Sequence, residues 1–214
     1  MHGWLAIDKD IGITSTQAVG RARRLLDAQK AGHAGTLDPL ATGVLPIALG
    51  EATKTVPYVM GGAKTYRFTV RFGEARDTDD LEGRILETND VRPDDGAIRS
   101  ALNRFTGVIS QVPPLYSAVK IHGERSYKRA RSGQGELPPA RNVEIDRFEL
   151  IDRPDSDHAL FEVDCGKGTY IRSLARDLGR DLGTVAYVSE LRRTRCGPFD
   201  EKDAISLDTL AESV

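Results

Sequence analysis

Alternating apolar and polar residues mark the strands of this chain. The clearest run spans residues 64–73, where every second residue from Tyr66 to Phe72 is apolar and the residues between them are threonine or arginine. Successive side chains of a strand point to opposite faces, so this run predicts a half-buried strand. Shorter runs predict further strands at 4–7, 112–121, 143–150 (with a bulge), 161–165 and 187–195.

Capping residues and helical spacing predict four helices. Thr14 and Gln17 form a capping box, in which each side chain satisfies a backbone amide at the start of the helix. The other three helices are expected to begin near Asp94, Thr169 and Ser206. Because strands outnumber helices and do not alternate regularly with them, the predicted fold class is α+β.

The helix predicted after Thr169 carries a stripe of arginines. Apolar residues at 171, 174, 178 and 182 share its inward face. Arg172, Arg176 and Arg180 lie on an adjacent stripe. Spacing alone makes the three arginines equivalent, and each is described equally well as a solvent-facing charge.

Composition narrows the class of protein. The 214 residues are 39% apolar and 29% charged, which excludes a disordered tail or a coiled coil. A chain of this length is expected to form one domain, or one domain with a small lobe. No apolar run approaches the ~18 residues of a membrane span, and the start shows no signal peptide, so we expect a cytoplasmic protein that avoids membranes.

Charge is unevenly distributed. The formal net charge is only −2, but basic residues gather in 120–131 and 165–196, whereas 77–96 is acidic. A chain that is near neutral overall can still carry one positive face. The alternative is that these segments are ordinary solvated surfaces.

The sequence shows neither a metal-binding pattern nor a nucleotide-binding loop. The four histidines are scattered, and Cys165 and Cys196 form no metal-binding or disulfide pattern. Residues 166–169 read G-K-G-T, but the glycine spacing upstream does not fit a phosphate loop, so a glycine turn before a helix is favoured. We therefore expect no metal and no cofactor.

A glycine-rich loop presents one carboxylate. Residues 32–43 read G-H-A-G-T-L-D-P-L-A-T-G, and Pro39 restricts Asp38 to extended conformations. Glycines allow the backbone to approach a ligand closely. From spacing alone, a common Asp-Pro turn explains this loop as well as a catalytic carboxylate does.

The loop resembles the signature of the TruB family of pseudouridine synthases, and the resemblance covers almost the whole chain. Six collinear blocks carry it: 9–15, 64–66 with 77–83, 111–120, 127–131, 168–174 and 191–193. The chain departs from the family at Asp10, where a proline is usual. It also ends near the point where a small C-terminal RNA-binding domain usually begins, so residues 1–214 are expected to be the catalytic domain alone, with that domain absent or truncated.

The resemblance implies a mixed, mostly antiparallel sheet flanked by helices, and an activity. The activity is the isomerisation of a uridine in the T-loop of tRNA (position 55) to pseudouridine, without a cofactor, by a monomer. Asp38 is implied as the nucleophile, with Arg172 paired to it and Tyr66 stacked on a flipped-out base. Whether Asp38 attacks the sugar or acts through a glycal is left open.

The remaining implied roles concern RNA binding. His33 matches the histidine that occupies the space left by the flipped base, and Leu191 matches the leucine that lines the uracil pocket. Core packing is the alternative for Leu191 and for Tyr66. Basic side chains are expected to contact phosphates, namely Lys120, Lys128, Arg129, Arg131, Arg192 and Arg193.

Two other functions remain as alternatives. The first is a non-catalytic RNA-binding or RNA-folding module on the same scaffold, and the joint presence of Asp38, Tyr66 and Arg172 argues against it. The second is a dyskerin-like synthase that depends on a guide RNA. The form of the loop and the lack of an appended RNA-binding domain argue against that branch.

Overall fold

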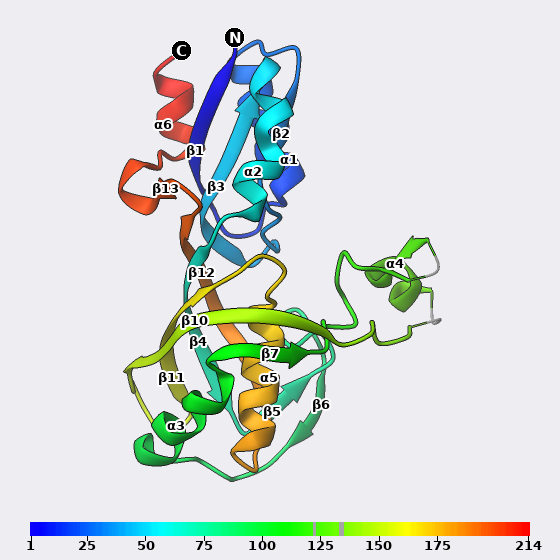
Figure 1. The fold of residues 1–214 in the computed structure, drawn as a ribbon, viewed down its shortest axis with the longest axis vertical. Helices are drawn as coiled ribbons and strands as arrows, with labels where there is room; N and C mark the ends of the chain where they lie inside the picture. Colours follow the sequence, from blue (N-terminus) through cyan, green and yellow to red (C-terminus); the bar gives the residue numbers. More distant parts are fainter. Residues whose placement is uncertain (122, 133–134) are drawn as a thin grey trace. The chain divides into compact units, whose positions relative to one another are not determined.

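The computed structural model describes residues 1–121, 123–132 and 135–214, which divide into two compact units. The first unit comprises Met1–Arg67 and Glu190–Val214, and the second comprises Phe68–Ser189. Strands β4 (Lys64–Phe72) and β12 (Ala186–Cys196) carry the chain from one unit to the other (Figure 1).

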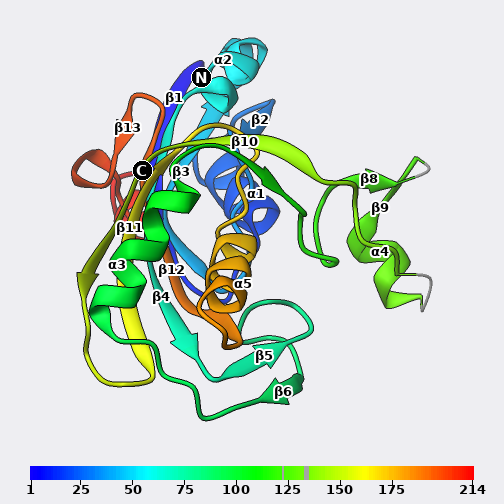
Figure 2. The same cartoon turned by 60° about the horizontal axis from the view of Figure 1, so that its bottom comes forward.

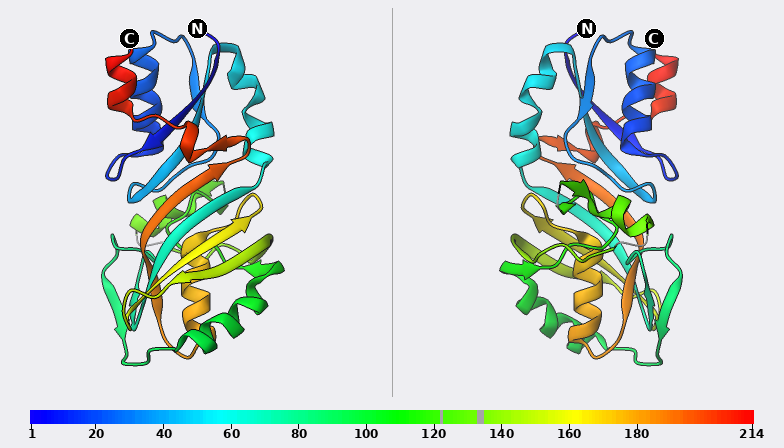
Figure 3. Two further views of the ribbon diagram at one scale, coloured as in Figure 1. Left: turned by 90° about the vertical axis from the view of Figure 1, so that its left-hand side faces the viewer. Right: turned by 90° about the vertical axis from the view of Figure 1, so that its right-hand side faces the viewer.

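The first unit is a small sheet with helices on both faces. Its strand order is β1-β3-β12-β4, with β2 paired to β3 and β13 paired to β12. Helices α1 and α6 pack together on one face, and α2 lies on the other (Figure 3). The elements of this unit are β1 (Gly3–Lys9), α1 (Ser15–Leu25), β2 (Ala31–His33), β3 (Ala41–Leu49), the 3-10 helix η1 (Gly50–Thr55), α2 (Val56–Gly61), β13 (Phe199–Asp200), η3 (Glu201–Asp203) and α6 (Leu207–Glu212).

The second unit is built on a row of strands in which the β10–β11 and β7–β10 pairs are antiparallel. Its strand order is β12-β4-β11-β10-β7, and α3 packs against both β10 and α5 (Figure 2). Two short hairpins, β5–β6 and β8–β9, stand apart from this sheet. The remaining elements are β5 (Glu74–Arg76), β6 (Ile85–Thr88), α3 (Asp95–Leu102), η2 (Asn103–Phe105), β7 (Gly107–Gln111), β8 (Lys120–Ile121), β9 (Glu124–Arg125), α4 (Ser126–Arg131), β10 (Arg141–Asp152), β11 (His158–Cys165) and α5 (Ile171–Asp181).

Most of the predicted elements are confirmed. The capping box of Thr14 and Gln17 is present, and Asp94 and Ser206 cap their helices. The bulge predicted in the strand at 143–150 appears as a register shift between Ile145 and Arg147 in the pairing of β10 with β11, and a second shift lies between Leu150 and Asp152. Strand β12 pairs with β3 in parallel, and the β1–β3, β2–β3, β10–β11 and β7–β10 pairs are antiparallel, so the sheet is mixed and mostly antiparallel as expected.

The strand predicted at 112–121 is wrong. Strand β7 ends at Gln111, and no strand follows until β8. Pro113 and Pro114 have no amide hydrogen to donate to a strand ladder. The carbonyl oxygens of Val112 and Tyr116 instead accept hydrogen bonds from side chains of α5, so this segment is held by a helix.

The start of helix α5 also differs from the prediction. Its N-cap residue is Tyr170, without a side-chain cap, and the helix begins at Ile171. The hydroxyl of Thr169 donates to the carbonyl of Gly166 and so closes the preceding turn. The amide of Tyr170 itself donates to the side chain of Gln111.

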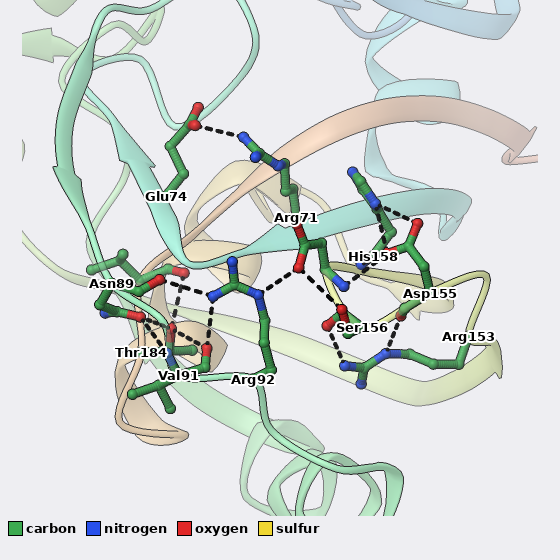
Figure 4. A network of polar contacts seen from close by, with 12 residues as sticks. Arg71, Glu74, Asn89, Val91, Arg92, Arg153, Asp155, Ser156, His158 and Thr184 are labelled. Atoms are coloured by element: carbon green, nitrogen blue, oxygen red, sulfur yellow. Dashed lines mark hydrogen bonds and ion pairs between the residues drawn. The ribbon is translucent and has the colours of Figure 1, made fainter.

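A network of charged groups fastens the segment before α3 (Figure 4). The guanidinium of Arg92 pairs with Asp157 at 2.6 Å and donates to the carbonyl of Asn89. The hydroxyl of Thr184 donates to the Asn89 side chain. Gly73 has a φ of +84°, and a Cβ there would lie 1.9 Å from the Arg92 guanidinium, so the close approach requires glycine.

No helix within the described part of the chain is long and apolar enough to cross a membrane.

We expect the aromatic cluster of the second unit to dominate its stability. Phe68 is 1% exposed and stacks on Phe161 and Phe148, with ring centroids 5.6 and 5.9 Å away. Phe68→Ala should lower the free energy of unfolding by ~3–5 kcal/mol, because it leaves a cavity among these rings. Urea denaturation measures this change. The control is Val108→Ala, at a residue that is 71% exposed, and a loss as large as that of Phe68→Ala would contradict the assignment of the core.

Candidate active site

Asp38 lies, half-buried, in the loop 34–40 between β2 and β3 of the first unit. Backbone bonds hold both ends of this loop. The amide of Ala34 donates to the carbonyl of Pro46, and the amide of Ala41 donates to the carbonyl of Asp38. The buried side chain of Ser15 on α1 binds both the amide and the carbonyl of Leu37. The residue next to Asp38 is therefore fixed to a helix.

Lys9 fastens the loop on the other side of Asp38. Its ammonium donates to the carbonyls of Asp10, Ile13 and Pro39, at 2.8, 2.8 and 3.3 Å. The residue is fully buried. Burial lowers the pKa of Lys9 to about 8; Asp10 and Asp38 oppose this fall, and the Arg193 cation adds to it. Lys9 therefore contributes positive charge close to the Asp38 carboxylate.

Arg193 on β12 binds both the loop and the start of β3. Its guanidinium donates to the carbonyls of Val44 and Gly35, at 2.8 and 3.0 Å. Gly43 has a φ of +98°, and a Cβ there would lie 2.2 Å from the Arg193 carbonyl oxygen, so only glycine allows β3 to run this close to β12. Arg193 is 1% exposed, which gives it an interior role in place of the expected phosphate contact.

Strand pairing places the predicted pocket leucine near this loop. Leu191 pairs with Ala41 in the parallel β12–β3 register, only three residues after Asp38. Leu191 is half-buried, whereas Tyr66 on β4 is 9% exposed. The first unit therefore contains Asp38, Leu191 and Tyr66.

His33 ends β2 and pairs with Ile47 of β3. Its Nδ1 atom is buried and has no hydrogen-bond partner among the described residues. Burial lowers the pKa of His33, and the neighbouring Arg193 cation lowers it further. The imidazole is therefore held in its neutral form beside the loop.

Arg172 belongs to the second unit, where it is a buried residue of helix α5. Its guanidinium donates to the carbonyl of Thr78 at 2.9 Å and to that of Tyr116 at 3.1 Å, and lies 3.6 Å from the carboxylate of Asp80. The three arginines that spacing made equivalent are thus distinct. The side chains of Arg172 and Arg176 are 6% and 12% exposed, whereas that of Arg180 is 69% exposed.

The residues expected to contact phosphates are placed in different ways. Arg192 forms a two-point ion pair with Asp8, at 2.9 and 3.0 Å, and a further pair with Glu201. Arg129 on α4 is half-buried. The side chains of Lys120, Lys128 and Arg131 lie outside the described residues.

No group of three or more possible metal ligands occurs among the residues that the structure describes.

Comparison with known families decides the assignment. The model of the TruB family pseudouridylate synthase N-terminal domain matches residues 23–171. The model of the tRNA pseudouridylate synthase B C-terminal domain matches residues 172–214. The chain belongs to the TruB family. Members of this family convert uridine to pseudouridine.

Curated TruB relatives are similar over nearly the whole chain. The tRNA pseudouridine synthase B of Gluconacetobacter diazotrophicus is 61% identical over 213 residues, and that of Bradyrhizobium diazoefficiens is 62% identical over 211 residues. These matches cover 100% and 98% of this chain, but 70% and 61% of the relatives.

Solved structures show the same fold. A Cbf5-Nop10-Gar1 complex contains a chain that is 34% identical, with a TM-score of 0.77 over 98% of this chain and 54% of that chain. An H/ACA RNP bound to a substrate RNA contains one that is 30% identical, with a TM-score of 0.74 over 98% of this chain and 52% of that chain. The TruB relatives are therefore nearly twice as similar in sequence as these neighbours.

Lys9 and Arg193 are the site residues whose roles sequence reasoning missed. Lys9 lies in the first TruB block and Arg193 in the last, but neither position predicts burial. Only the fold brings both cations under one loop.

We predict that His33 makes the protein sensitive to acid. Because its pKa is lowered in the folded state, the unfolded chain takes up a proton first as the pH falls below ~6.5, the ordinary value for histidine. The contribution of the neutral His33 to the free energy of unfolding is therefore present above that pH and is lost as the pH falls below it. Urea denaturation at pH 7.5 and 5.5 should show a smaller loss for His33→Gln than for the wild type. Equal losses would contradict the burial of a neutral imidazole.

Proposed function

We propose that this chain isomerises a uridine in the T-loop of tRNA (position 55) to pseudouridine, with Asp38 as the nucleophile. The half-exposed carboxylate of Asp38, on a loop fastened by Ser15, Lys9 and Arg193, carries the proposal. A reactive group that is already held in its productive geometry speeds the reaction, because the site does not have to reorganise when the substrate binds. We also propose that the protein acts on tRNA as a monomer in the cytoplasm.

The reaction conserves all atoms. The bond from N1 of the uracil to C1′ of the ribose breaks, the base rotates, and a bond from C5 to C1′ forms. The proton that leaves C5 is replaced by one at N1, so no electrons are gained or lost. One carboxylate suffices because the leaving base stays bound, whereas a glycosidase needs two. Attack on C1′ and passage through a glycal both fit this balance.

Three further side chains have proposed roles around the base. Tyr66 stacks on the flipped-out uracil, which is worth ~1–3 kcal/mol per base, and Leu191 lines the pocket. His33 occupies the space that the base leaves, in its neutral form. Flipping costs a few kcal/mol, and these contacts offset that cost.

Arg172 is proposed to pair with Asp38. A guanidinium offers a planar fork that binds a carboxylate at two points. Two backbone carbonyls orient this fork in the second unit, which makes Arg172 a rigid partner.

RNA binding is proposed to rest on phosphate contacts from Arg129 and Arg192, together with Lys120, Lys128 and Arg131. Arg193 is left out because its guanidinium is buried under the loop. Structured RNA is recognised largely by shape and by splayed-out bases, which suits contacts of this kind.

The tRNA branch of the superfamily is favoured over the guide-dependent branch. The observation that favours it is the 61% identity to a tRNA pseudouridine synthase B, against 34% to the Cbf5 chain.

Asp38→Asn should abolish turnover and leave RNA affinity unchanged, because it removes the charge but little volume. The substrate is a T-arm stem-loop labelled with tritium at C5 of the target uridine, since isomerisation releases that hydrogen. We expect the single-turnover rate to fall by at least ~100-fold, the lower range for a group that takes part directly in the chemistry. Asp10→Asn is the control, because Asp10 also lies near Lys9 but outside the loop. A rate for Asp38→Asn within tenfold of wild type would refute the assignment.

We also predict a steep salt dependence of RNA affinity. Each phosphate contact contributes a slope of about −0.7 to −0.9 in a plot of log affinity against log salt. Arg192→Gln should lower that slope by about one contact, as measured by filter binding. An unchanged slope would remove Arg192 from the RNA-binding face.

A further inference from the structure

The turn between β5 and β6 packs on helix α5 through two arginines. Arg172 and Arg176 lie one helical turn apart, so their side chains leave the same side of α5. Arg172 binds the carbonyl of Thr78 and faces Asp80, while Arg176 binds the carboxylate of Asp79 at 3.1 Å. Three consecutive residues of the turn are therefore held by two guanidinium groups.

Asp79 occupies the bend of this turn. Its φ is +60°, in the left-handed region, where aspartate is tolerated better than most residues. Its carbonyl accepts from the amide of Val188 at 3.1 Å. Its side chain is 14% exposed, and burial raises its pKa, which Arg176 and Arg172 oppose. Without a cation beside it, this carboxylate would be a buried, unpaired charge.

The bend at Asp79 sets the direction of both neighbouring groups. Thr78 presents its carbonyl, and Asp80 its carboxylate, to the same guanidinium. The Asp80 carboxylate is itself oriented by the hydroxyl of Thr78 and the amide of Glu82. A shift of the bend would therefore move two of the groups that surround Arg172.

Arg176 also reaches the segment that follows β7. Its guanidinium donates to the carbonyl of Val112 at 2.8 Å and to Asp177 at 2.9 Å. Arg172 donates to the carbonyl of Tyr116 in the same segment. Each arginine thus joins the turn on one side to the 112–116 segment on the other.

We propose that the Arg176–Asp79 ion pair is a positioning device for Arg172, because it fixes the turn whose Thr78 carbonyl and Asp80 carboxylate orient that guanidinium. Arg176 is a positioning residue and does not touch the RNA. The effect on catalysis rests on the proposed role of Arg172 beside Asp38.

Three single variants test the proposal by single-turnover rate and by RNA affinity. Arg176→Lys keeps the charge but loses the planar guanidinium that binds Asp79, Asp177 and the Val112 carbonyl together. We expect its rate to fall ~10–100-fold with unchanged affinity. Asp79→Asn, which tolerates the same φ and removes the charge, should lower the rate in the same way and covers the case in which Arg176→Lys fails to fold. Arg180→Lys is the matched control on the exposed turn of α5 and should keep the wild-type rate. Wild-type rates for Arg176→Lys and Asp79→Asn would overturn the proposal.

A double-mutant cycle separates positioning from general loss of structure. If Arg176 acts through Arg172, then Arg176→Lys should lower the rate by less than twofold in a chain that already carries Arg172→Lys. Additive losses would contradict the proposal, because they would show that Arg176 acts independently of Arg172.

Nitrogen-15 NMR of the arginine side chains tests the geometry without activity. The Arg172 guanidinium hydrogens should exchange slowly in the wild type and in Arg180→Lys, and at least tenfold faster in Asp79→Asn. Suppose that the wild type fails to isomerise the T-loop uridine while Asp79→Asn still exchanges at least tenfold faster than the wild type. In that case the proposed function fails and the positioning of Arg172 stands. If exchange is unchanged in Asp79→Asn, the positioning proposal fails whatever the activity.

Discussion

Two buried cations beneath one loop are the constraint on which the site of the first unit depends. Lys9 and Arg193 donate to backbone carbonyls on both sides of Asp38. A buried charge is costly unless it is hydrogen-bonded, so the loop cannot shift without leaving a cation unsatisfied. The backbone on both sides of Asp38 is therefore fixed. His33 is neutral for a related reason: burial lowers its pKa, and the positive charge of Arg193 disfavours a second positive charge beside it.

The second unit uses the same physical device on a helix. Arg172 and Arg176 bind carbonyls of the 112–116 segment and carboxylates of the acidic turn. Carbonyl acceptors orient a guanidinium, and carboxylates compensate its charge. In the second unit this device holds the proposed partner of Asp38, the guanidinium of Arg172, in one orientation.

The sequence predicted what depends on local patterns. Alternation along β4 and the capping box at Thr14 required only near neighbours, and both are confirmed. The predicted strand at 112–121 failed because its carbonyls bind residues some sixty positions away on α5, which no local pattern contains. Strand β3 was missed because Gly43 and Pro46 interrupt its apolar run.

The site shows the same division. The family motifs predicted roles for Asp38 and Arg172. Periodicity could not distinguish Arg172 from Arg176 and Arg180, because exposure is set by the turn that packs on the helix. Arg193 was expected on the RNA face and lies beneath the loop, because the glycine at 43 brings β3 against β12. Burial of charge is a tertiary property, and it is what distinguishes these arginines from one another.

Mapping pseudouridine at single-nucleotide resolution tests the central claim most directly. The measurement uses this chain and an unmodified, full-length tRNA transcript, without any guide RNA. The account predicts one new pseudouridine, in the T-loop, and none elsewhere in the transcript. An unmodified T-loop, or modification at another position, would contradict it.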